Sequence, residues 1–116
     1  DSALERVALA YRVALGHDPW HAEARGHLSQ LLRRRGLALA KRGGDNDAAA
    51  AQLREAIEVE PRDTDSRIFL AAVLEQKGDL QGARSAYEDV LRICPGHPIA
   101  ARNLEEIVGR LATHQA

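Results

Sequence analysis

Apolar residues recur along the chain three or four positions apart, the spacing that places them on one face of a helix. The clearest stretch is 64–95, where Leu70 and Leu74 belong to one apolar stripe and Tyr87 belongs to a second. Gly78 separates the two stripes, and glycine is favoured where the backbone needs a positive φ. This stretch therefore predicts two helices joined by a short turn.

The same spacing continues on both sides of this hairpin and predicts an all-α fold of about six helices. Alanine and leucine dominate the apolar residues, and only 3% of the chain is aromatic. Strands, by contrast, are enriched in aromatic and β-branched side chains. The expected helices cover residues 3–16, 22–42, 46–59, 64–77, 80–93 and 98–113.

Prolines divide the chain into similar units. Pro95 follows Pro61 by 34 residues, Pro61 follows Pro19 by 42, and a leucine lies nine residues after each proline. A glycine–aspartate pair also stands 17 and 16 residues before both Pro61 and Pro95. A period of this size is typical of proteins built from stacked helical hairpins.

The unit resembles the tetratricopeptide repeat, a 34-residue hairpin with Leu-Gly, Tyr, Ala, an aromatic residue and a closing proline at fixed places. The matching residues are Leu70-Ala71, Leu74, Ala83, Tyr87 and Pro95. Arg67 and Val90 depart from the pattern. The resemblance implies a right-handed α-solenoid of stacked antiparallel helix hairpins. As one domain over 1–116, it would contain a half-repeat helix (1–18), a repeat with an extended first helix (19–61), a regular repeat (62–95) and a terminal or capping helix (96–116).

The first complete repeat is eight residues longer than the regular period. Because the spacing is regular up to Leu28 and again from Gly44 onward, the extra residues are expected between Leu28 and Gly43. Eight residues are close to two turns of an α-helix, so they can lengthen the helix without rotating its apolar face. We therefore expect a helix over 22–42 that extends beyond its partner by about two turns at 33–42, with Gly36 as the place for a kink.

The charge balance gives no reason to expect a general attraction to polyanions. The chain has 16 Lys and Arg against 17 Asp and Glu, a formal net charge of −1. No apolar run approaches the ~20 residues that span a bilayer. One basic stretch stands out on the predicted extension and consists of Arg33, Arg34, Arg35, Lys41 and Arg42. It has three interpretations: a solvated helix face, a surface for a partner protein or a second copy, or a phosphate-contacting strip.

No arrangement of residues predicts catalysis, a cofactor or a metal ion. His17, Asp18 and His21 lie close together at a proline turn, but a metal site needs three or four converging ligands of fixed geometry. No serine has a histidine and an acid at a spacing that indicates a triad, and no glycine-rich phosphate loop is present. Cys94 is the only cysteine, which excludes an internal disulfide and suits the cytosol or the periplasm. The abundance of Ala, Arg, Leu and Gly favours a bacterial protein.

The resemblance implies protein–protein recognition, because in that family the first helix of each repeat lines a concave side that binds peptides or helices of partner proteins. Carried over position by position, the candidate groove residues are Glu23, Gln30, Arg33, Asp65, Ile68, Ala72, Glu75, Ile99, Arg102 and Glu106. One subgroup of the family grips a C-terminal carboxylate with Lys, Arg and Asn side chains. That clamp is absent, since the matching positions hold Gly26, Gln30, Phe69, Ile99 and Asn103.

Two further hypotheses stand beside a peptide-binding scaffold. In the first, the unpaired end helices and the 33–42 extension bury apolar surface against copies of the same chain. The unpaired ends equally suit a piece of a longer repeat array. In the second, the basic strip at 33–42 contacts nucleic acid, although no aromatic residues are interleaved there for base stacking.

Overall fold

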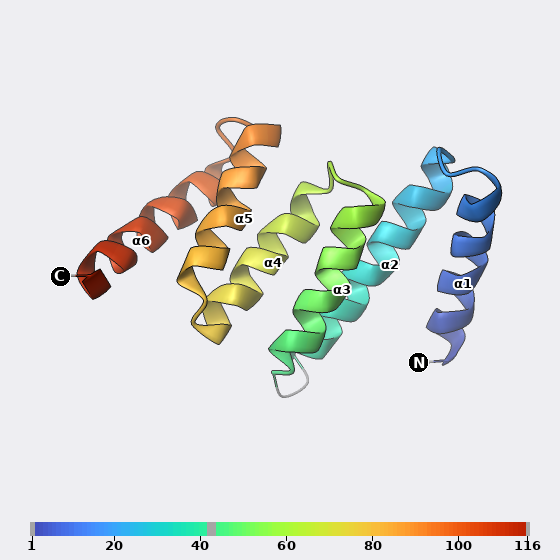
Figure 1. Cartoon of the computed structure of the whole chain (residues 1–116), viewed down its shortest axis with the longest axis horizontal. Coiled ribbons are helices and arrows are strands. Elements are labelled where there is room, and N and C mark those ends of the chain that lie inside the picture. The colour runs from blue at the N-terminus through green and yellow to red at the C-terminus, as the bar shows by residue number, and fades with distance from the viewer. Residues whose placement is uncertain (1, 42–43, 116) are drawn as a thin grey trace.

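The computed structural model describes residues 2–41 and 44–115, which form six helices and no strand. The helices stand in a row along the long axis of a molecule that measures 52 × 33 × 18 Å (Figure 1). Within the described ranges, no helix combines the length and the apolar character needed to cross a membrane. The helices are α1 Ser2–His17, α2 Ala22–Lys41, α3 Asn46–Val59, α4 Thr64–Lys77, α5 Leu80–Ile93 and α6 Pro98–Gln115. The expected all-α solenoid of six helices is confirmed.

Aspartate side chains fix where three of the helices begin. Asp45, Asp63 and Asp79 each accept a hydrogen bond from the backbone N–H three residues later. These bonds satisfy N–H groups that have no partner in the first helical turn. At the other end of α4, Gly78 has a φ of 88°, the left-handed conformation that the sequence predicted for it. The turn of the α4–α5 hairpin therefore follows directly from two adjacent residues.

The core consists of two clusters that overlap along the row of helices. The larger joins α2 to α6 around residues such as Leu53, Leu74 and Tyr87. Tyr87 is only 1% exposed and is the largest fully buried side chain, as its place in the repeat predicted. The smaller cluster joins α1, α2 and α3 through residues that include Leu28 and Leu32. Each helix thus buries its apolar face mainly against its neighbours in the row.

Helix α2 contains most of the extra residues of the first repeat. It has 20 residues, whereas α4, its counterpart in the next repeat, has 14. Six of the eight extra residues therefore lengthen the helix. The other two fall between α2 and α3, where Arg42 and Gly43 lie outside the described residues, so the helix predicted over 22–42 is followed as far as Lys41.

The extension predicted at 33–42 is wrong, because this part of α2 is packed against other helices. A methyl group placed on Gly36 would lie 2.9 Å from Leu53 Cγ in α3. Leu39 and Ala40 pack against the larger core cluster. Gly36 therefore lies in a continuous helix and allows α3 to approach closely, rather than marking the expected kink.

The additional turns lie at the start of α2, which reaches beyond the end of α3 (Figure 1). There, Arg25 Nε donates a hydrogen bond to the carbonyl oxygen of Val59 (3.2 Å). The side-by-side packing of α2 and α3 explains why the additional turns lie at the start of α2. Gly36 and the apolar side chains of the second half of α2 fix its register against α3, so the first turns of α2 extend past the end of α3.

A buried polar cluster joins α2 to the start of α4. Asp63 accepts hydrogen bonds from Ser29 Oγ and Ser66 Oγ, both at 2.5 Å, and pairs with Arg33 at 3.0 Å. Burial by itself raises the pKa of Asp63, but the hydrogen bonds from the two serines and the charge of Arg33 together hold that pKa below its usual value. The carboxylate thus fixes how the first helices of the two repeats lie against each other.

Candidate partner-binding groove

A mainly apolar pocket of about 280 Å³ lies between α2 and α4. We call it the α2–α4 groove. Its side walls come from the first helices of the two complete repeats, whose relative position is set by Asp63. Its lining residues are Leu37, Ala40, Lys41, Phe69, Ala72, Val73 and Gln76.

A second pocket of about 290 Å³, which we call the α1–α2 hollow, lies on the other side of α2. Tyr11 Oη and His27 Nδ1 form a hydrogen bond of 2.8 Å across it, and their rings meet edge to face. The hollow is lined by Val7, Tyr11, His27, Gln30, Leu31 and Arg34.

Helix α2 separates the two pockets and presents a mixed ridge between them. Gln30, Arg34, Leu37 and Lys41 recur at intervals of three or four and therefore share one helix face. Gln30 and Arg34 line the hollow, and Leu37 and Lys41 line the groove. This ridge has one apolar side chain between two basic ones.

The three consecutive arginines of α2 point to three different places. Arg33 pairs with Asp63 of the α4 N-terminus at 3.0 Å, and Arg35 approaches Glu5 of α1 at 3.9 Å. Arg34 is exposed at the hollow and forms no ion pair within the described part of the chain. Of the four side chains of the predicted basic strip that the structure describes, two therefore form ion pairs within the chain.

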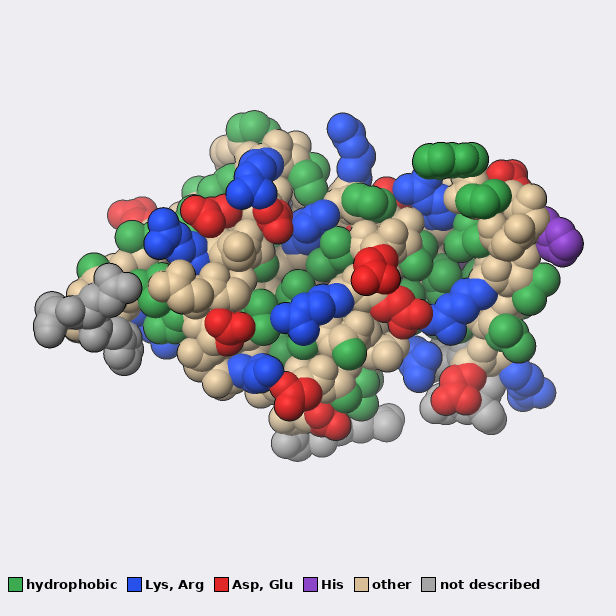
Figure 2. Space-filling model, in the orientation of Figure 1, with side chains coloured by type: hydrophobic (Ala, Val, Ile, Leu, Met, Phe, Trp, Pro, Cys, Tyr) green, Lys and Arg blue, Asp and Glu red, His purple; other side chains and the backbone are tan. Residues whose placement is uncertain are grey.

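The opposite face has a balanced charge. Figure 2, where α3 lies in front of α2, shows acidic and basic side chains interspersed over the helices. Ion pairs elsewhere on the helices include Lys77 with Asp47 at 2.5 Å and Arg84 with Glu88 at 3.6 Å. This face therefore behaves as an ordinary solvated surface.

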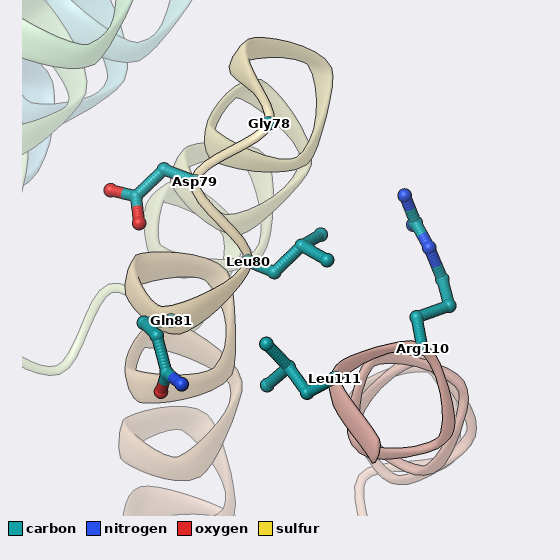
Figure 3. Close-up of a pocket in the computed structure, with 6 residues that line it drawn as sticks. All are labelled: Gly78, Asp79, Leu80, Gln81, Arg110 and Leu111. Atoms are coloured by element: carbon teal, nitrogen blue, oxygen red, sulfur yellow. The ribbon is translucent and has the colours of Figure 1, made fainter. Parts of the chain in front are cut away.

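A larger cleft of about 480 Å³ lies between the α4–α5 turn and the last turns of α6. Leu80 and Leu111 point toward each other across it, whereas Asp79 turns away (Figure 3) and caps α5 through Gly82. Arg110 extends from α6 on the right of the same view. The cleft therefore offers an apolar contact surface with one cation beside it.

The sequence profile described as Tetratricopeptide repeat matches residues 38–98, more than half of the chain. The chain belongs to the tetratricopeptide repeat family. This agrees with the packed hairpins α2–α3 and α4–α5 and with the proline spacing. No curated protein matches the sequence.

Solved structures share the fold of this tetratricopeptide repeat chain at low sequence identity. MamA has a TM-score of 0.67 and 19% identity, covering 90% of this chain and 77% of its own. The first repeat domain of Spaghetti (RPAP3), bound to the HSP90 peptide SRMEEVD, has a TM-score of 0.67 and 20% identity over 96% of this chain and 82% of its own. The Yersinia enterocolitica type III secretion chaperone SycD, in complex with a peptide of the translocator YopD, has a TM-score of 0.65 and 14% identity. The match covers 100% of this chain and 97% of the SycD chain.

The structure gathers few of the ten groove residues that the sequence singled out. Ala72 lines the α2–α4 groove and Gln30 lines the α1–α2 hollow. Arg33 is held by Asp63, and Ile68 packs against the larger core cluster. The exposed remainder consists of Glu23 on α2, Asp65 on α4, and Ile99, Arg102 and Glu106 on α6.

Glu75, the last of the ten predicted groove residues, is part of a polar cluster among α4, α5 and α6. Burial raises its pKa above the usual value, although the nearby charge of Arg110 opposes this shift. In the same cluster, Asn103 Nδ2 donates a hydrogen bond to Tyr87 Oη at 3.2 Å, and burial raises the pKa of Tyr87. Glu75 therefore contributes to the joint between the last three helices.

Sequence reasoning missed most of the groove lining, including Leu37, Lys41 and Phe69. The signal that could have found them is the repeat spacing counted from the end of the first helix of each repeat, instead of from its start. Leu37 and Lys41 stand 35 positions before Ala72 and Gln76, close to the regular period of the family. Counting from Pro19 instead shifted the expected groove toward the start of α2.

The residues that line the groove in the described part of the chain are apolar side chains, one lysine and one glutamine. Among the described residues, no group of three or more His, Cys, Asp or Glu side chains could hold a metal ion. His21 of the predicted turn accepts a hydrogen bond at Nδ1 from the N–H of Ala24 (3.0 Å), so it caps α2. Cys94 is exposed at the end of α5. The surface offers contacts suited to recognition.

Proposed function

We propose that this chain is a protein-interaction module that binds a segment of a partner protein in the α2–α4 groove. The observation that carries the proposal is the groove itself, a mainly apolar hollow between the first helices of the two complete repeats. The solved structures of Spaghetti and SycD support it, since both of those tetratricopeptide-fold chains are described with peptides.

The groove has room for one apolar side chain of a peptide. Its volume is about 280 Å³, and its lining is mainly apolar. A buried leucine or phenylalanine would contribute about 1.5–3 kcal/mol. Several such contacts along the row of first helices would then be needed for firm binding.

Selection of random 12-residue peptides displayed on phage tests this proposal. We expect peptides that bind the parent chain to lose binding to the Ala72→Trp variant, because the indole fills the groove. Ala51→Trp is the matched control, since Ala51 is exposed on α3 and its substitution leaves the groove open. Thermal melts by circular dichroism check that both variants are folded. Peptides that bind all three proteins equally, or no enriched peptides at all, would refute the proposal.

A second candidate is self-association through α1. Leu9 and Val13 are 60% and 55% exposed on this helix, and Trp20 after it is 81% exposed. Residues four apart share a helix face, so Leu9 and Val13 form an apolar pair. The 33–42 extension does not contribute an apolar surface to such contacts, since Leu39 and Ala40 are packed against the core.

A further inference from the structure

We infer that the partner segment carries acidic side chains on either side of an apolar one, and that Arg34 and Lys41 select them. The inference rests on the proposed function, because it names the chemistry of the peptide that occupies the α2–α4 groove.

The apolar requirement comes from the centre of the groove. Leu37 and Ala40 of α2 face Phe69 and Ala72 of α4 across it. Among the residues that the structure describes, no acidic side chain lines the groove or the α1–α2 hollow. An unpaired polar side chain inserted between these walls would lose hydration without gaining a partner. A leucine, isoleucine or phenylalanine would instead be buried.

The acidic requirement comes from the two cations on the ridge of α2. Arg34 precedes Leu37 by one helical turn and Lys41 follows it by one turn, so both flank the apolar centre on the same face. Within the described residues neither forms an ion pair, whereas the adjacent Arg33 and Arg35 are both paired. The fold thus engages two arginines of the run and leaves the middle one open to a partner.

The spacing of the two cations sets the spacing of the acids. Seven residues of α-helix separate Arg34 and Lys41 by about 10 Å along the axis. An extended peptide advances about 3.3 Å per residue and points successive side chains to opposite faces, so residues four apart share a face and lie about 13 Å apart. The long side chains of Arg34 and Lys41 span the small difference. A segment that runs along α2 would therefore place two Asp or Glu side chains about four positions apart, with the apolar residue midway between them on the same face. Charge-assisted hydrogen bonds to carboxylates are roughly twice as strong as neutral ones.

The test compares peptides selected on three proteins from the same 12-residue library. These are the parent chain, the double variant Arg34→Glu/Lys41→Glu and the control Arg54→Glu/Arg62→Glu. The control reverses the same amount of charge at two exposed arginines outside both pockets. The strongest parent-selected peptide is then synthesised with acetylated and amidated ends, so that only its side chains carry carboxylates, and its affinity is measured by fluorescence anisotropy.

We expect the parent and the control to enrich peptides with Asp or Glu beside a large apolar residue. The capped peptide should bind the Arg34→Glu/Lys41→Glu variant at least about tenfold more weakly, which corresponds to about 1.4 kcal/mol. Its affinity for the parent should also fall as salt is raised.

Two other results overturn the inference in distinguishable ways. The first is the enrichment of neutral or basic peptides that bind the parent chain but not the Ala72→Trp variant. That result would refute the acidic partner, while the proposed function stands. The same follows if acidic peptides bind the double variant as tightly as the parent. Peptides that are indifferent to Ala72→Trp, or a failure to enrich any, would refute both the groove and its selectivity.

Discussion

Gly36 brings α2 and α3 into contact at a point where no side chain fits. A Cβ there would lie 2.9 Å from Leu53 Cγ and 3.2 Å from the carbonyl oxygen of Ala49, and Leu53 is fully buried. Glycine in a helix costs up to about 1 kcal/mol relative to alanine. In α2 this cost is outweighed by the close approach of the neighbouring helix.

Gly36→Ala is therefore expected to destabilise the chain by about 1–2 kcal/mol. The reason is that overpacking of about 1–3 kcal/mol exceeds the gain in helix propensity. Gly26→Ala is the control in the same helix. No described atom would lie within 4 Å of its new methyl group, so it should stabilise by about 0.5–1 kcal/mol. Urea denaturation measures both, and a stabilised Gly36→Ala protein would contradict the packing described for α2.

The Asp63 carboxylate links two helices that are far apart in the sequence. Ser29 and Arg33 reach it from α2, and Ser66 reaches it from α4. Its pKa is below the usual value in the folded chain. Its contribution to stability is therefore fully present above the unfolded pKa of about 3.9 and is lost as the pH falls through the folded pKa.

Asp63→Asn should accordingly lower the free energy of unfolding by about 1–3 kcal/mol at pH 7. The difference from the parent should shrink as the pH is lowered from about 5 to 3. Asp65→Asn is the control, because Asp65 also lies in the first turn of α4 but is exposed, so its effect should stay within about 0.5 kcal/mol. Urea denaturation across this pH range measures the free energy of unfolding of the three proteins. A difference between the parent and Asp63→Asn that does not depend on pH would contradict the role of the carboxylate.

At the scale of the elements, the length of α2 and its register are separate properties. The number of extra residues was readable from the proline spacing, and six of them do lengthen α2. Their position was not readable, because a helix can be displaced along its axis by whole turns while its apolar stripe stays on the same face. Contacts of Gly36 with α3 and of Ser29 with Asp63 decide between the alternatives.

The α2–α4 groove follows from that register. Because the second half of α2 is the part that packs against α3, Leu37 and Lys41 face Phe69 and Ala72. If the first half of α2 had packed against α3 instead, polar residues such as Glu23 would have come to lie opposite α4. The candidate site therefore depends on one displacement of one helix, which explains why the fold was predicted more completely than the site.

At the scale of the whole molecule, the two ends of the row differ from its centre. The α4–α5 hairpin is covered on both sides, whereas α1 contacts mainly α2 and exposes Leu9 and Val13. Exposed apolar surface of this kind often indicates an interaction site.

If α1 mediates self-association, the parent should sediment faster at high than at low concentration, over a range of about a hundredfold. Leu9→Glu/Val13→Glu should remove this dependence, and Ala51→Glu on α3 should retain it. Sedimentation velocity makes the comparison. A parent that stays monomeric throughout would eliminate the second candidate function and leave the peptide-binding proposal unaffected.

The sequence by itself determined the six helices and their repeat, as the proline spacing, the Gly78 turn and the buried Tyr87 illustrate. These features depend on side-chain spacing within one helix and on hydrogen bonds between residues a few positions apart. Only the tertiary structure decided where the extra turns of α2 lie and which two of its three consecutive arginines form ion pairs within the chain. Those outcomes depend on how helices distant in the sequence pack side by side, and periodicity along a single helix carries no information about that packing.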